Sequence, residues 1–99
     1  EVIHLQLRSE YKVKGGKLIK VTLEVENDVI KKALIAGDFF LYPEDAIEHI
    51  ERSLVGASLN SSDLEYIVAK AVKESGAQLL GFSINDIAEA LKLASQSKV

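Results

Sequence analysis

Residues 19–30, with the sequence IKVTLEVENDVI, decide the fold class of the N-terminal half. In residues 19–26, apolar and polar side chains alternate, which is typical of a β-strand with one buried and one solvated face. Asn27 and Asp28 follow, and both residue types tolerate the positive φ of a two-residue turn. The stretch therefore predicts an antiparallel hairpin whose return strand spans residues 29–37.

The predicted turn also fixes a register for this hairpin. It places Val25 opposite Ile30 and Leu23 opposite Lys32. Continued along the strand, it places Val21 opposite Leu34. Lys32 would then lie on the apolar face, and its ammonium group would have to extend along that face to reach water.

The chain before this hairpin alternates in the same way, and it is joined to residues 19–26 through Gly15 and Gly16. A two-residue loop at these glycines would place Tyr11 opposite Lys20, so the two apolar rows would lie on opposite faces of the sheet. A loop of three or five residues, or a bulge, restores the agreement. We therefore predict a bulged or longer loop at 14–17, with backbone N–H groups open to another partner.

From Pro43 onward the apolar residues recur at helical spacing. The first predicted helix begins at Pro43 and ends before Gly56, and a capping-box pattern at Ser62 predicts the start of a second. A third is predicted to begin at Ser83, and residues 77–82 are apolar enough for a short strand or a buried connection. Residues 1–99 thus predict one α+β domain, a small antiparallel sheet of about three strands followed by three helices packed on one face.

Composition excludes several classes of function. The 99 residues carry a net charge of −3, which argues against nucleic-acid binding, and no cysteine, which excludes thiolate metal sites and thiol catalysis. Two histidines make a compact metal site improbable. No apolar run approaches the roughly 18 residues of a membrane span, and no signal-peptide pattern precedes the first strand, so we expect a cytoplasmic protein that does not bind membranes.

No set of catalytic residues is apparent either. Ser61 and Ser62 are expected to cap a helix. The carboxylates of the first predicted helix are expected to form a solvated face. They are Glu44, Asp45, Glu48 and Glu51. We predict no catalytic residue, no metal and no cofactor bound by this chain alone.

Basic charge gathers around the two glycines. Residues 1–20 carry five basic and two acidic side chains, whereas the remaining 79 carry seven and thirteen. Glycines let backbone amides approach an anion, and lysine is a point-charge partner for phosphate. Lys14, Gly15, Gly16 and Lys17 are therefore candidates for phosphate contact, although a solvated hairpin tip with lysines would have the same pattern.

A second unusual stretch, GDFFLYP at 37–43, joins the last strand to the first helix. The sequence leaves two interpretations of its residues Asp38, Phe39 and Phe40 open. The aromatic side chains could pack in the core and brace the strand end, or they could anchor an interface.

Read together, KVKGGKL at 12–18 and GDFFLYPE at 37–44 resemble the C-terminal accessory domain of lipoate–protein ligases. The helix that follows, down to Gly56, also fits the pattern of that family. The resemblance spans most of the chain and is strongest over residues 11–56. Lys14 departs from it, because many members have proline there.

This resemblance implies an α+β accessory domain that is needed chiefly for activation of lipoate to lipoyl-AMP, with ATP and Mg. It implies a catalytic ligase subunit as the partner of this chain. Indirectly, it implies lipoyl carrier domains of 2-oxoacid dehydrogenase or glycine cleavage proteins, which receive the lipoyl group on a lysine. The catalytic domain is absent from this chain, so the resemblance assigns it no catalytic residue.

Our hypothesis is that residues 14–17 contact the nucleotide region of the catalytic subunit, with Asp38, Phe39 and Phe40 bracing them or forming an interface. The alternative is a protein-binding scaffold without a role in the chemistry. A small RNA-binding domain would require salt-sensitive binding and disagrees with the acidic total. An independent enzyme disagrees with the absence of a base, nucleophile or metal set.

Overall fold

The computed structural model describes residues 3–60 and 62–97 of the chain. Within these residues the elements follow in an order that begins with strands and ends with a helix. They are β1 (His4–Lys12), β2 (Leu18–Glu26), β3 (Val29–Gly37), β4 (Phe40–Tyr42), α1 (Ala46–Leu54), α2 (Leu64–Ser75), β5 (Gln78–Leu80) and α3 (Ile84–Ser95).

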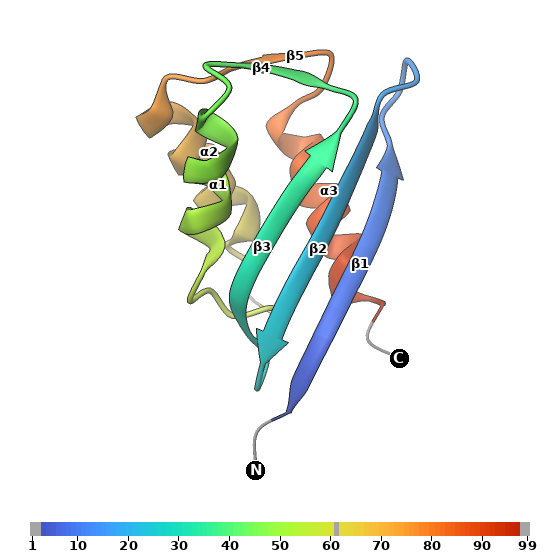
Figure 1. Ribbon diagram of the computed structural model, residues 1–99, viewed down its shortest axis with the longest axis vertical. Coiled ribbons are helices and arrows are strands. Elements are labelled where there is room, and N and C mark those ends of the chain that lie inside the picture. Colours follow the sequence, from blue (N-terminus) through green and yellow to red (C-terminus); the bar gives the residue numbers. More distant parts are fainter. Residues whose placement is uncertain (1–2, 61, 98–99) are drawn as a thin grey trace.

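The first three strands form an antiparallel sheet in the order β1-β2-β3. Helix α3 packs against β1 and β2, and α1 packs against β3 and α2, so the helices cover one face of the sheet (Figure 1). The predicted α+β architecture is confirmed. Its core contains seven large aliphatic side chains with no exposed surface: Ile19, Leu23, Ile30, Ile50, Leu54, Ile87 and Leu91.

The predicted turn at Asn27 and Asp28 is confirmed, because both residues have positive φ, 51° and 64°. Val25 faces Ile30 as predicted, but Glu24 faces Lys32, so β3 has one additional residue, Lys31, at this point. This bulge shifts the register of the pairs beyond Val25 and Ile30.

The predicted positions of Lys32 and Leu34 are therefore wrong. Leu23 faces Ala33, Val21 faces Ile35, and Lys32 faces Glu24 on the solvated side. The bulge leaves both adjacent lysines, Lys31 and Lys32, exposed, so neither ammonium group has to cross the apolar face.

The loop between β1 and β2 has five residues, 13–17, and Tyr11 faces Ile19. The predicted odd-length loop is confirmed. The Val13 N–H donates to the Lys17 carbonyl at 2.7 Å, and the Gly16 N–H donates to the Val13 carbonyl at 3.0 Å. Gly15 has a φ of +103°, as has Gly16, a value that residues with a side chain rarely adopt.

Helix α1 begins at Ala46, three residues later than the predicted start at Pro43. The reason is that residues 40–42 form β4, and the chain then turns, with the Ala46 N–H donating to the Pro43 carbonyl at 3.0 Å. Helix α2 begins at Leu64 with Asp63 at the N-cap position, so the predicted capping role of Ser62 is wrong. Ser61 lies outside the described residues.

The predicted start of the third helix at Ser83 is confirmed, and a capping box forms there at the start of α3. The Ser83 hydroxyl accepts from the Asp86 N–H at 3.2 Å, and the Asp86 carboxylate accepts from the Ser83 N–H at 2.8 Å. The short strand considered for residues 77–82 is also present. It is β5, which pairs antiparallel with β4.

One edge of the main sheet is closed by the second half of the chain. The Ile35 N–H of β3 donates to the Glu51 carboxylate of α1 at 2.7 Å, and Val29 bridges to Ser58. The spacing of Glu51 predicted a purely solvated helix face, and this hydrogen bond shows that the prediction is wrong for Glu51. The opposite edge belongs to β1, beside which the described residues place no further strand.

Candidate functional site

The two stretches that the sequence singled out meet at one end of the molecule. The loop 13–17 and the ribbon formed by β4 and β5 lie at the top of Figure 1, and the start of β1 lies at the opposite end. The antiparallel pairing explains this, because the last residues of β1 and β3 and the first residues of β2 lie at the same end of the sheet.

Asp38 joins the two stretches by hydrogen bonds to Leu18. The Asp38 Oδ1 atom accepts from the Leu18 N–H at 2.6 Å, and the Asp38 N–H donates to the Leu18 carbonyl at 3.3 Å. At the preceding position, Gly37, a Cβ atom would collide with the same Leu18 carbonyl oxygen. The strand that leaves the glycine loop is thus fixed by residues about twenty positions away.

Lys17 folds back onto the ribbon. Its Nζ atom lies 5.3 Å from the centre of the Phe40 ring, within the range of a cation–π interaction. Its aliphatic stem lies along Gly81, where an added Cβ would be 3.3 Å from the Lys17 Cε atom. Gly81 follows β5, so Lys17 links the glycine loop to both strands of the ribbon.

Phe39 and Phe40 have different environments. The Phe39 ring lies 4.4 Å from the Phe82 ring, centre to centre, and packs against the buried core. Phe40 is 67% exposed. The geometry therefore gives Phe39 a packing role and leaves Phe40 available to a partner.

Lys14, Gly15 and Gly16 form the exposed tip of the loop. A Cβ atom added to either glycine would meet no atom within 4 Å, so the space around the tip is open. The structure thus brings Lys17, Asp38, Phe39 and Phe40 into one connected cluster and presents Lys14 at its outer end. The Gly16 N–H is already bonded to the Val13 carbonyl, so the prediction of open N–H groups is wrong at Gly16. The tip can present the positive charge of Lys14 to an anionic or polar surface of another molecule.

An open groove of about 380 Å³ lies beside Phe40. It is lined mainly by apolar side chains of β3, β4 and α1, with Glu44 as its charged member. The other lining residues are Ile35, Ala36, Gly37, Phe39, Phe40, Leu41 and Ile47.

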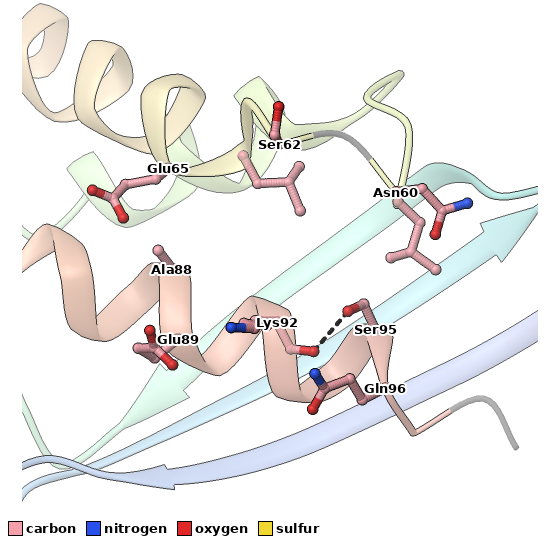
Figure 2. Close-up of a pocket in the computed structure, with 10 residues that line it drawn as sticks. Asn60, Ser62, Glu65, Ala88, Glu89, Lys92, Ser95 and Gln96 are labelled. Carbon is pink, nitrogen blue, oxygen red and sulfur yellow. Dashed lines mark hydrogen bonds between the residues drawn. The ribbon is translucent and has the colours of Figure 1, made fainter.

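A larger hollow of about 550 Å³ lies elsewhere, between the start of α2 and the second half of α3 (Figure 2). Two carboxylates, Glu65 and Glu89, and the ammonium group of Lys92 line it, and the Ser95 hydroxyl donates to the Lys92 carbonyl at 2.6 Å. None of the residues predicted as site residues lines this hollow.

Gly81 and Phe82 are parts of the site that the sequence did not indicate. Gly81 supports the Lys17 stem, and Phe82 supports Phe39. The available signal was a glycine next to an aromatic residue after an apolar pair, but the pairing of β5 with β4 that makes it meaningful joins residues about forty positions apart.

Across residues 3–60 and 62–97, no three His, Cys, Asp or Glu side chains are grouped as a metal site would require. Within the same residues, none of the helices has the length and apolar character needed to cross a membrane.

Two comparisons with known proteins concern the archaeon Thermoplasma acidophilum. The chain is 42% identical over 57 residues to its "Lipoate-protein ligase A subunit 2", an alignment that covers 58% of this chain and 60% of that relative. A solved chain from a study of a bi-partite lipoate protein ligase and its E2 lipoyl domain superposes with a TM-score of 0.79 at 32% identity. That superposition covers 90% of this chain and 97% of the solved one.

The sequence pattern of the family described as "Bacterial lipoate protein ligase C-terminus" matches residues 4–91. The match includes the glycine loop, Asp38, both adjacent phenylalanines and Phe82. The resemblance stated from the sequence is therefore confirmed, and this chain belongs to the bacterial lipoate protein ligase C-terminus family.

Proposed function

We propose that this chain is the non-catalytic accessory subunit of a two-subunit lipoate–protein ligase. In this proposal a separate catalytic subunit uses ATP, with Mg, to convert lipoate to lipoyl-AMP, and it requires this chain for that step. The observation that carries the proposal is the similarity to a chain solved in the study of the bi-partite ligase, which covers 90% of this chain and 97% of the solved one.

The geometry supports a role in closing the catalytic subunit's site. A rigid body that covers a reaction centre can exclude water and fix a loop around a charged substrate. Lys14, Gly15 and Gly16 are exposed, and in this proposal they contact the nucleotide region of the partner. Asp38 and Lys17 would hold that tip in position through Leu18 and Phe40.

The proposal extends to the later step of the reaction. The catalytic subunit would transfer the lipoyl group from lipoyl-AMP to a lysine of a lipoyl carrier domain, as in 2-oxoacid dehydrogenase or glycine cleavage proteins. This chain would act before that transfer, and its connection to the carrier would be through the catalytic subunit. The use of ATP also leads us to place the complex in the cytoplasm.

The test separates adenylation from transfer. The catalytic subunit is incubated with ATP, Mg and lipoate, with and without this chain, and lipoyl-AMP and pyrophosphate are measured. Transfer is measured separately from chemically prepared lipoyl-AMP to a carrier domain. We expect this chain to be required for the first reaction and to change the second little.

Two results would contradict the proposal. One is equal formation of lipoyl-AMP with and without this chain, and the other is turnover of ATP by this chain alone. Tight binding to the catalytic subunit without any stimulation would instead support the alternative of a protein-binding scaffold.

A further inference from the structure

The outer side of the β4–β5 ribbon carries three large exposed side chains. Phe40, Tyr42 and Leu80 are 67%, 70% and 56% exposed, respectively. Phe40 faces Leu80 directly across the ribbon, and Tyr42 lies two residues along the same strand, so all three project from one side. We refer to Phe40, Tyr42 and Leu80 as the ribbon face.

The inner side of the ribbon is occupied. Leu41 and Leu79, which face one another between the two outward rows, are partly buried and pack against the core. The ribbon therefore has its own apolar support, and the ribbon face contributes little to the packing of this molecule. Clustered exposed aromatic and aliphatic side chains are typical of sites that bind another protein.

The surroundings of the ribbon face indicate the chemistry of its partner. The Lys17 ammonium group lies beside the Phe40 ring, and Lys14 lies on the neighbouring loop tip. Phe40 also lines the groove of about 380 Å³, whose other lining residues are apolar apart from Glu44. A partner carboxylate is therefore favoured beside Lys17 and Lys14 and disfavoured beside Glu44.

We propose that the ribbon face is the docking surface for the catalytic subunit. The complementary surface would present one apolar side chain to the groove beside Phe40 and at least one carboxylate to Lys17. This inference rests on the proposed function for the identity of the partner. It assigns Tyr42 and Leu80 a role that the sequence did not suggest, and it separates docking, by the ribbon face, from contact with the nucleotide region, by Lys14.

The experiment measures the affinity of the purified catalytic subunit for variants of this chain by titration calorimetry. Phe40→Ala and Leu80→Ala are each expected to weaken binding at least about tenfold, as central apolar anchors do. The matched control is Tyr66→Ala on α2, because Tyr66 is also 67% exposed but lies outside the ribbon. It should leave affinity unchanged. Thermal melts of all variants test whether each remains folded.

A second pair of variants tests the charge. Lys17→Met keeps an apolar stem against Gly81 but removes the ammonium group, and Lys70→Met makes the same change at an exposed lysine of α2. We expect Lys17→Met to weaken binding and to reduce its dependence on salt concentration, whereas Lys70→Met should do neither.

The outcomes distinguish this inference from the proposed function. If Phe40→Ala and Leu80→Ala stay folded and bind as tightly as the unmodified chain, the docking surface is wrong, while stimulation of lipoyl-AMP formation can still support the accessory role. If the unmodified chain neither binds nor stimulates the catalytic subunit, both are wrong. Loss of affinity confined to the ribbon-face and Lys17 variants supports the docking surface.

Discussion

Asp38 and Leu18 hold one another by two hydrogen bonds, one through the Asp38 carboxylate and one through its backbone N–H. Leu18 is the first residue of β2, and the glycine loop ends immediately before it. This pair therefore connects the end of β3 to the base of the loop that carries Lys14.

Removal of the carboxylate should loosen the base of the glycine loop. Asp38→Ala is expected to lower the free energy of unfolding by about 1 kcal/mol, the scale of one net hydrogen bond to a partly solvated group. Amide hydrogen exchange at Leu18 should accelerate in this variant. Asp38→Asn, which keeps an acceptor oxygen, should retain part of the protection. Unchanged exchange at Leu18 in Asp38→Ala would show that the bond does not hold the loop.

Gly37 and Gly15 should respond differently to the same substitution. Gly37→Ala places a Cβ against the Leu18 carbonyl oxygen, a backbone atom that cannot move without shifting β2. We expect a loss of about 2 kcal/mol or more, as in overpacked sites. Gly15→Ala has open space around it, and its cost of about 1 kcal/mol arises from positive φ alone. Chemical denaturation of both variants checks this order, and equal losses would contradict it.

The two adjacent phenylalanines should separate stability from binding. Phe39→Ala removes the ring that packs on Phe82 and is expected to destabilise the fold by about 2 kcal/mol, from lost packing and the lost aromatic pair. Phe40→Ala should change stability by less than about 0.5 kcal/mol, since its ring is largely exposed. Thermal unfolding measures both, and a larger loss for Phe40→Ala would reverse our assignment.

Lys14 is expected to act in the reaction of the complex without contributing to the fold. Lys14→Ala should reduce the rate of lipoyl-AMP formation by up to about fivefold, the effect of losing an exposed charge contact of about 1 kcal/mol. Its melting temperature should not change. Lys70→Ala on α2 is the matched control and should leave the rate unchanged. Equal rates for both variants would remove Lys14 from the proposed contact.

The bulge in β3 predicts tolerance of a deletion. In the observed register Lys32 already faces Glu24 and Ile30 already faces Val25, with Lys31 as the additional residue between them. Deleting Lys31 should therefore leave an uninterrupted ladder and a folded protein. Deleting Thr22 from the regular part of β2 shifts the following side chains to the wrong face and should unfold the chain. Circular dichroism melts of the two deletion variants test this prediction, and an unfolded Lys31 deletion would contradict it.

The sequence was sufficient for features that depend on local spacing. Alternation in 19–26, the turn at Asn27 and Asp28, and the odd-length glycine loop all follow from period-two patterning and the need to keep apolar rows on one face. The stripes of the three helices follow from their 3.6-residue period in the same way.

Two kinds of feature were not predictable in this way. One depends on which of two local conformations has the lower free energy in the whole sheet, and the other depends on strand pairing between distant parts of the sequence. The adjacent lysines 31 and 32 indicated an irregularity, but whether the chain would bury an aliphatic stem or form a bulge depends on the whole sheet. Similarly, the position of Phe40 over Lys17 requires β4 to pair with β5, and no local pattern around residue 40 indicates a partner near residue 80.

The unequal edges of the main sheet have a consequence for association. Hydrogen-bonding groups of β3 are occupied near both of its ends, by Glu51 at Ile35 and by Ala57 at Ile30, whereas no described strand pairs with the outer edge of β1. Within this sheet, β1 therefore offers the edge for a further strand. Two copies that pair through their β1 strands would form one continuous six-stranded sheet. The β1 edge of each copy would then be covered, and a third copy could not pair with it. At high concentration, self-assembly through sheet edges should therefore stop at a dimer, which light scattering can detect, and should not continue into fibrils.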